Sequence, residues 1–484
     1  MNDGSKYSMF DLRKPLTILK KGTVMSNITS FSLSLQKQFE NNRVFFDSEI
    51  DNAFNELNLR SLLSRSSIVK QKGYSTVSIL LLIVLLPFLK RTLNDFRNTN
   101  YIKNQIDAQK DTTYRFLNNE RFNWRKFVYF VALKIISLSE NAPFSQKVLI
   151  ADDTIALKTG KSMELVSYHF DHKTSRSVLG NQCLQLAYHD GINFFPLDVA
   201  FSSSSKRPNN KYRDIDKRTN GWKRRKEALG KKTDALVQMT QRAWNNGIEA
   251  SFILFDSWFA HDDVINKIYQ IGYGVICRLK RGHVKYTYQG KAYTLKELWK
   301  EFAKKKTTYI GKGQMKGYCL NVTLPKTGEV RILFVSDGKK QWQALLCTDL
   351  ELEASEILDY YARRWAIEVF FKDAKQMLNL GKEQSRTFDA VVSSYSIVML
   401  RYLLLVFLMS KRRTTGSFGP LFRELSEKQT FLHMVEKMWD YVKELIIKSS
   451  HLVCYEIELD TVLQLINIAE NSLFDTGRLV TAKL

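Results

Sequence analysis

Paired cysteines, repeats and long apolar runs are scarce in this sequence of 484 residues. Its five cysteines are widely spaced and include no Cys-x-x-Cys pair, which argues against a disulfide framework or a zinc site. The segment Val77–Leu89 could be mistaken for a membrane span, but its 13 residues fall short of the roughly 20 that a bilayer requires. We expect a buried core helix there, bent near Pro87. The N-terminus lacks the residue order of a signal peptide, so we expect a soluble, cytoplasmic protein.

Acidic residues are too few to balance the basic ones. Lys and Arg total 73 against 49 Asp and Glu, which gives a net charge of +24. A surplus of this size in a chain of ordinary globular composition indicates a polyanionic partner, most commonly nucleic acid. A solvated basic surface or attraction to anionic lipid is the alternative. The length allows two or three domains.

The first 144 residues have helical periodicity. Apolar residues recur at helical spacing through Ile28–Phe46 and Ile50–Leu63. Asp111–Leu138 predicts two short helices, with a turn at Asn118–Asn119 and a second helix from near Arg121. The pair resembles a helix-turn-helix, and an ordinary helical hairpin explains it equally well. Four basic residues are expected to face outward: Arg115, Arg121, Arg125 and Lys126.

Strand patterns begin after Pro143 and alternate with helices, which predicts an α/β sheet. Two short apolar strands end in acids: Lys147–Ala151 is followed by Asp152 and Asp153, and Ser251–Phe255 by Asp256. Functional side chains gather at strand ends in open α/β sheets, although a single such Asp is more often a turn residue. Further elements are expected in this order: a hairpin of Cys183–Tyr188 and Phe194–Phe201, helices at Ala235–Trp244 and Val264–Ile271, and a strand at Gly274–Leu279.

A basic tract runs from Lys206 to Lys232, with 12 Lys or Arg against three acids. Such a tract is suited to contact a DNA backbone, and binding through it would depend steeply on salt. A solvated loop remains plausible for its first half. Trp222 beside a run of basic residues favours DNA contact in the second half, and the candidate residues are Lys223, Arg224 and Arg225.

The segment Ala354–Leu378 predicts a helix with a polar stripe. Tyr361, Glu368 and Lys375 are seven residues apart and fall on one side of a helix, with Arg364 beside them. A carboxylate between two cations suits a metal ligand flanked by phosphate contacts. Intrahelical ion pairs on a surface helix give the same spacing. Apolar neighbours on several sides favour a half-buried Glu368 over that alternative.

The spacing Tyr-(2)-Arg-(3)-Glu-(6)-Lys resembles the signature of the insertion sequence 4 family of bacterial DDE transposases. Other segments are also similar to this family, over roughly residues 70–390. The segments IADDTIALKTGK and ILFDSWFA resemble its two Asp segments, and Leu378–Gly381 with Gln384–Arg386 resembles the stretch after the signature. Earlier stretches of the family are similar to YRFLNNERFNWR and MELVSYHFDH.

The resemblance implies a ribonuclease H-like fold, a mixed sheet with helices on both sides, and three metal ligands, Asp152, Asp256 and Glu368. Asp152 is preferred over Asp153 because it stands two residues before Thr154. The implied cofactor is a pair of Mg²⁺ or Mn²⁺ ions. The implied DNA contacts are Tyr361, Arg364, Lys375, Arg278 and Trp342, the last through stacking on a base, although a core tryptophan is the commoner explanation.

The expected organisation is a helical DNA-binding region at 1–144, a catalytic core at 145–282 and 348–390, a β-rich insertion at 283–347 and a helical region at 391–484. The resemblance implies cut-and-paste transposition by a homodimer that holds two terminal inverted repeats of double-stranded DNA. A nuclease that does not join ends and a non-catalytic DNA-binding protein are the alternatives. A membrane partner is not expected, since no lipidation motif or basic amphipathic helix is present.

Overall fold

The computed structural model describes most of the chain between residues 49 and 449. The described ranges are 49–92, 110–139, 147–171, 174–209, 213–310, 315–337, 341–414 and 416–449. The chain divides into two compact units, one of Asp47–Glu427 and one of Met1–Phe46 with Lys428–Leu484. The first unit carries the sheet and all the sites considered below. The helix expected at Ile28–Phe46 lies outside the described residues.

A mixed sheet of twelve strands is the framework of the larger unit, and the predicted α/β class is confirmed. Its path runs β2-β3-β1-β5-β6-β12-β11-β10-β7-β8, with β4 paired to β3 and β9 to β10. The first six strands along the chain are β1 (Val148–Leu157), β2 (Ser167–Asp171), β3 (Arg176–His189), β4 (Phe194–Ser202), β5 (Phe252–Phe255) and β6 (Gly274–Arg278). The predicted hairpin is confirmed as antiparallel β3 and β4.

Three parallel strands, β1, β5 and β6, form the centre of this sheet. The first four residues of β1 and all of β5 are buried, as expected for parallel strands covered on both faces, whose sequences read as continuous apolar runs. β1 is longer than predicted and extends through Leu157. Asp152 and Asp153 therefore lie inside a strand, paired across to Gln185 and Leu184 of β3, and not at its end.

The β-rich segment predicted at 283–347 continues the same sheet. Its strands are β7 (Lys285–Tyr288), β8 (Lys291–Thr294), β9 (Thr308–Tyr309), β10 (Lys316–Leu324), β11 (Gly328–Ser336) and β12 (Trp342–Cys347). β12 pairs antiparallel with β6, which joins this segment to the central strands by backbone hydrogen bonds. The helix expected at Leu295–Lys304 consists of α12 (Leu295–Leu298) followed by a π-helical turn, η2 (Trp299–Ala303).

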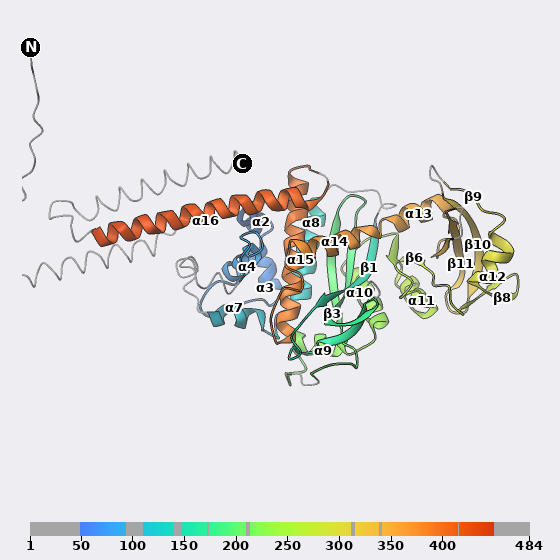
Figure 1. The fold of residues 1–484 in the computed structure, drawn as a ribbon, viewed down its shortest axis with the longest axis horizontal. Helices are drawn as coiled ribbons and strands as arrows, with labels where there is room; N and C mark the ends of the chain where they lie inside the picture. The colour runs from blue at the N-terminus through green and yellow to red at the C-terminus, as the bar shows by residue number, and fades with distance from the viewer. Residues whose placement is uncertain are drawn as a thin grey trace, which may run out of the picture. The chain divides into compact units, whose positions relative to one another are not determined.

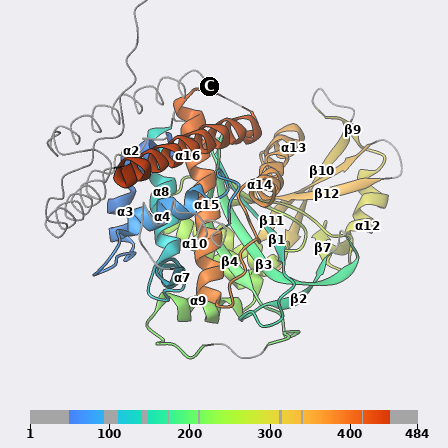
Figure 2. The same ribbon diagram turned by 60° about the vertical axis from the view of Figure 1, so that its left-hand side comes forward.

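Helices cover the central strands. α10 (Lys232–Asn245) and α11 (Asp262–Ile271) pack together, and α10 also contacts β3 and β4. α11 ends at Gly272, whose φ of +117° suits a glycine and where a Cβ would meet the Trp244 ring at 2.6 Å. α8 (Trp124–Leu138) and α15 (Phe388–Lys411) pack against β4 and each other. Figures 1 and 2 show α8 and α15 beside the strands β1, β3 and β4, with β10 and β11 at the opposite end of the sheet.

The N-terminal helices are shorter than the sequence predicted. Ile50–Leu63 is divided into α2 (Glu49–Glu56) and α3 (Leu59–Arg65), because Asn58 takes a left-handed conformation between them. α4 (Thr76–Leu85) ends before Pro87 and is not bent by it. Leu86 still has helical backbone angles, and Pro87 has no backbone N–H to continue the helical hydrogen bonds. α7 (Lys110–Leu117) and α8 flank the predicted turn, with α8 starting at Trp124 after the Asn123 cap.

Helix α15 is long and apolar enough to cross a membrane by length and composition. However, 94% of its most apolar window is buried inside the protein. Arg401 in its middle donates to the backbone carbonyls of Val84 and Leu378, which satisfies a charge that is itself buried. In this structure α15 is a core helix. α16 (Phe418–Ser449) follows it and continues into the second unit, of which residues 428–449 are described.

Candidate active site

Asp152 and Asp153 point to opposite faces of β1, as successive side chains of a strand do. Asp152 Oδ2 accepts a hydrogen bond from Arg364 Nη1 at 2.8 Å. Asp153 instead pairs with Lys232 and accepts from Gln182 Nε2 at 3.0 Å. Only the first of the two adjacent carboxylates therefore faces the helix that carries Glu368.

The predicted single helix at Ala354–Leu378 is wrong in one respect, because the chain forms two helices. α13 (Ala354–Ala362) carries Tyr361, and α14 (Trp365–Gln376) carries Glu368 and Lys375. At the junction the backbone N–H groups of Arg363 and Arg364 bond three residues back, each at 3.1 Å, instead of four. Arg364 thus stands at the start of α14, which packs on β1.

The Arg364 guanidinium joins two carboxylates that are far apart in the sequence. Nη1 contacts Asp152 Oδ2 at 2.8 Å, and Nη2 contacts Glu368 Oε1 at 2.6 Å. Strand β1 and helix α14 are thereby held so that the two acids converge on one cation. The (i, i+4) ion pair expected within the helix is present, but it also reaches the sheet, which a surface helix would not do.

Asp256 lies on the same side of the site. β1 and β5 are parallel, with Ile150 opposite Leu254, so continuing this register by two residues places Asp152 beside Asp256. Burial raises the pKa of Asp152 to about 7, and the negative charge of Asp256 adds to this, while the guanidinium of Arg364 acts in the opposite direction. Asp256 is thus near enough for its charge to act on Asp152.

The remaining polar residues of the predicted signature surround these acids. Lys375 Nζ donates to Thr154 Oγ1 at 2.7 Å, two residues along β1 from Asp152 and on the same face. The Arg364 guanidinium lies 5.7 Å from the centre of the Tyr361 ring. Burial raises the pKa of Tyr361 to about 12, so its hydroxyl can donate a hydrogen bond at neutral pH. Arg278 is exposed at the end of β6, and its charge also acts on Tyr361.

Two family models match the chain across this site. A model described as DDE superfamily endonuclease matches residues 80–293, and one described as transposase DDE domain matches residues 228–404. These parts of the chain are therefore similar to DDE endonuclease and transposase domains. Asp152 lies within the first match, Glu368 within the second and Asp256 within both. Among proteins of curated function, none matches the sequence.

The donor atoms of Asp152, Asp256 and Glu368 suit a hard divalent cation, since all three acids offer carboxylate oxygens. Within the residues that the structure describes, however, no three His, Cys, Asp or Glu side chains are gathered closely enough to hold a metal ion. Asp152 and Glu368 both contact the Arg364 guanidinium, each through one carboxylate oxygen. The residues therefore fit a cation in charge and chemistry, and a bound cation would compete with Arg364 for these two carboxylates.

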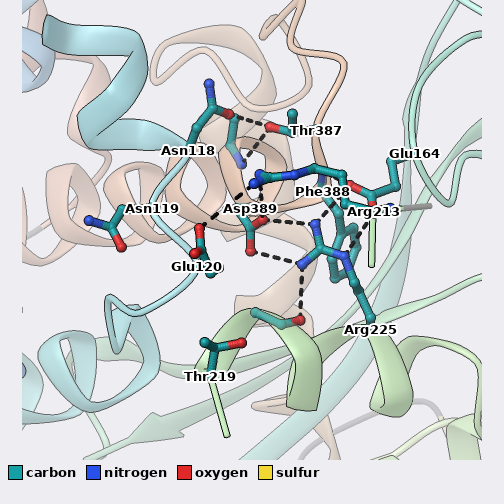
Figure 3. Close-up of polar contacts among 12 residues, drawn as sticks. Asn118, Asn119, Glu120, Glu164, Arg213, Thr219, Arg225, Thr387, Phe388 and Asp389 are labelled. Carbon is teal, nitrogen blue, oxygen red and sulfur yellow. Dashed lines mark hydrogen bonds and ion pairs between the residues drawn. The ribbon is translucent and has the colours of Figure 1, made fainter. Parts of the chain in front are cut away.

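Arg225 was predicted to contact DNA, but the structure places it in the interior of the larger unit. It is 3% exposed, and its guanidinium contacts both oxygens of Glu164 and both of Asp389 at 2.7 to 2.9 Å. Figure 3 shows this guanidinium between the two acids, with Arg213 and Phe388 close by. The Phe388 backbone N–H donates to Glu164 as well, at 2.8 Å. A buried charge needs such partners, so Arg225 is structural.

Two basic neighbours of Arg225, Lys223 and Arg224, differ from each other in exposure. Arg224 is also buried, in α9 (Asn220–Ala228), and donates to the backbone carbonyl of Val199 at 2.6 Å. The DNA contact predicted for Arg224 is corrected for the same reason as that of Arg225. Lys223 is exposed, so the prediction that it contacts DNA stands.

Trp342 is also a core residue and cannot stack on a base from where it lies. It is 9% exposed and stacks on Trp299, with ring centres 5.2 Å apart and an interplanar angle of 17°. The Arg281 guanidinium lies 4.5 Å from its ring centre on β12. The commoner explanation of an isolated tryptophan in a strand is therefore the correct one here.

Two residues beside the site were missed in the sequence. Lys232, at the start of α10, neutralises Asp153, and its ammonium lies 3.7 Å from the ring centre of Trp258. Trp258 follows Asp256 by two residues, and this proximity was the one signal in the sequence. The ion pair between Lys232 and Asp153 joins positions 79 residues apart and could not be predicted from the local sequence.

Proposed function

We propose that this protein is a DNA transposase that excises and joins an insertion sequence by a cut-and-paste route. The observation that carries the proposal is that Arg364 contacts both Asp152 of β1 and Glu368 of α14, while the charge of Asp256 acts on Asp152, within matches to DDE endonuclease and transposase models. The resemblance to the insertion sequence 4 family and its Tyr-Arg-Glu-Lys signature supports the same function. We also propose that the core is ribonuclease H-like.

The three acids would hold two Mg²⁺ or Mn²⁺ ions, which when bound supply an activated oxygen nucleophile and stabilise the leaving oxygen of a phosphodiester. Arg364 contacts Asp152 and Glu368 in the structure, and it would turn to the DNA phosphate when these acids are occupied. Lys375 of α14, which donates to Thr154 on the same face of β1 as Asp152, would contact a second phosphate oxygen. A guanidinium and an ammonium at this position offset the charge of the DNA backbone.

The phenol of Tyr361 and the exposed side chain of Arg278 complete the proposed phosphate contacts. Tyr361 remains protonated at neutral pH and can donate to a phosphate oxygen without bringing a second negative charge. Arg278 lies on the neighbouring strand β6, near enough for its charge to act on Tyr361. Both residues would position the DNA strand, and the three acids would hold the metal ions that catalyse the reaction.

Charge and surface support double-stranded DNA as the partner. The chain has a net charge of +24, and Lys304, Lys305 and Lys306 form an exposed basic run next to η2. Lysines of this kind bind phosphates without reading the base sequence. We propose that a homodimer holds two terminal inverted repeats, that a membrane is not a partner, and that the protein acts on DNA in the bacterial cytoplasm.

A joining assay tests this proposal. A labelled duplex carrying the repeat that bounds the coding sequence is incubated with Mg²⁺ and a supercoiled plasmid, using wild type, Glu368→Ala and, as a control, Glu329→Ala. Glu329 is an exposed acid on β11. We expect cut ends joined to the plasmid with wild type and Glu329→Ala, and neither step with Glu368→Ala, which should still bind DNA.

Each other outcome assigns a different function. Cutting without joining by wild type would make the protein a nuclease of the same fold. Tight DNA binding without cutting would make it a non-catalytic DNA-binding protein. Equal activity of Glu368→Ala and wild type would remove Glu368 from the site.

A further inference from the structure

Lys232 occupies a position that helix stability does not explain. It is the first residue of α10, where the positive end of the helix dipole disfavours a cation, and its side chain is only 8% exposed. A buried ammonium is costly unless it is paired. The Asp153 carboxylate of β1 pairs with it, and the ring centre of Trp258 lies 3.7 Å from it. Lys232 therefore joins strand β1 to the turn that follows β5.

The ion pair between Lys232 and Asp153 is held on the face of β1 opposite Asp152. Gln182 of β3 donates from Nε2 to Asp153 Oδ2 at 3.0 Å, which fixes the carboxylate from the neighbouring strand. Helix α10, which carries Lys232, packs on β3 as well. The ammonium thus has a defined position behind the strand that carries Asp152.

The turn after β5 connects this ammonium to Asp256. The Trp258 ring lies beside the Lys232 ammonium, at a distance typical of a cation–π contact. It also packs against the buried ring of Phe259 at 73°, with ring centres 4.8 Å apart. The backbone N–H of Trp258 donates to Asp256 Oδ1 at 2.9 Å, so the Asp256 carboxylate cannot turn freely. The Trp258 side chain thus contacts Lys232, while the backbone of the same residue orients an acid of the site.

We propose that Lys232 is a positioning residue for Asp256, which it holds through the turn at Trp258. The inference rests on the proposed function, because it needs a metal ion at Asp256. Groups that orient a metal ligand through hydrogen bonds affect metal affinity by about 10- to 100-fold when they are changed. Lys232 would act one step further out, by fixing the residue that donates such a bond.

Positioning and charge predict opposite effects when Lys232 is removed. Loss of a cation near the acids, with Asp153 left unpaired, makes the region more negative and should strengthen the binding of a divalent cation. Loss of positioning should weaken it. A weaker metal affinity in a variant without the lysine therefore cannot come from the change in charge.

The chain offers a matched control near the other end of β1. The side chain of Lys147 is 15% exposed and forms an ion pair with Glu249 at 4.0 Å. It precedes Asp153 by six residues, about 20 Å at 3.3 Å per residue of a strand. Lys147→Met therefore removes a lysine that is also largely buried and ion-paired, far from Asp256.

The test measures Mn²⁺ binding by electron paramagnetic resonance, without DNA. We expect Lys232→Met to raise the dissociation constant for Mn²⁺ by about tenfold. Trp258→Leu should raise it too, because this change removes the ring but keeps the backbone N–H and both charges of the ion pair. Lys232→Arg, whose guanidinium can make the same two contacts, and Lys147→Met should bind Mn²⁺ as wild type does. Because only affinity changes, Lys232→Met should still cleave DNA at saturating Mg²⁺.

The outcomes separate this inference from the proposed function. Mn²⁺ binding by Lys232→Met or Trp258→Leu that is as tight as that of wild type, or tighter, would overturn the inference and leave the proposed function untouched. Failure of wild type to bind Mn²⁺, or unchanged binding in Asp256→Asn, would overturn the proposed function and this inference with it. A partial loss of folded protein lowers the number of Mn²⁺ sites and does not alter their dissociation constant.

Discussion

Replacing Arg225 tests whether the basic tract contacts DNA or supports the fold. Its guanidinium holds Glu164 and Asp389 through four contacts of 2.7 to 2.9 Å and donates to the Gly221 carbonyl at 3.0 Å, all in the interior. Removing one partner from a buried ion pair costs about 3–5 kcal/mol, because the remaining charges are left without compensation. Arg225→Met should therefore lower the free energy of unfolding by this amount.

The exposed neighbour two residues away provides the control. Lys223→Met should change the free energy of unfolding by under about 0.5 kcal/mol, because it removes no buried contact. If Lys223 binds one phosphate, the slope of log K against log salt should become shallower by about 0.9. Urea unfolding followed by circular dichroism gives the first quantity, and DNA binding from 50 to 200 mM salt the second. An Arg225→Met variant that is as stable as Lys223→Met, with a shallower salt slope, would refute the structural role.

Three further changes have defined outcomes. Lys304→Gln, Lys305→Gln and Lys306→Gln together should weaken binding to all DNA sequences and reduce the salt slope by about 1 to 3, and an unchanged slope in a binding titration would exclude this run as a contact. Trp342→Ala should lower the free energy of unfolding by about 3–5 kcal/mol in urea, whereas a base-stacking residue would lose DNA affinity with little change in stability. Burial alone would raise the pKa of Glu164, but the hydrogen bonds from Arg225 outweigh it and lower that pKa below its usual value. Glu164 should therefore stabilise the fold above about pH 4.3, its unfolded pKa, and the stabilisation should fade as pH falls below it. In Glu164→Gln, the midpoint of urea unfolding should change less with pH between pH 7 and 3 than it does in wild type. A pH dependence as steep as that of wild type would contradict this.

Short-range sequence patterns predicted the central strands of the sheet. The burial of single residues depended instead on contacts between distant parts of the chain. The apolar runs before Asp152 and Asp256 are the parallel strands β1 and β5, as their composition indicated. The spacing between Arg364 and Glu368 also correctly indicated that the two side chains are neighbours. Such patterns succeed because they depend on the repeat of a single helix or strand.

The wrong DNA contacts have one cause, which is that burial depends on partners distant in the sequence. Arg225 reads as part of a basic surface until Glu164 and Asp389, 61 and 164 residues away, are placed beside it. Trp342 is covered by Trp299 from another element. The break before α14 likewise leaves no local mark, since Arg363 and Arg364 are acceptable helix residues. Tertiary contacts thus override local preference at these positions.

The most direct test of the central claim replaces a proposed metal ligand with cysteine. Asp152→Cys should lose DNA cleavage with Mg²⁺ and regain part of it with Mn²⁺, which accepts a sulfur ligand more readily than Mg²⁺ does. Asp153→Cys is the matched control, because its side chain faces Lys232 on the other side of β1, and it should cleave DNA with Mg²⁺. Full activity of Asp152→Cys with Mg²⁺, together with an inactive Asp153→Cys that Mn²⁺ restores, would contradict the assignment of Asp152 as the first carboxylate of the site.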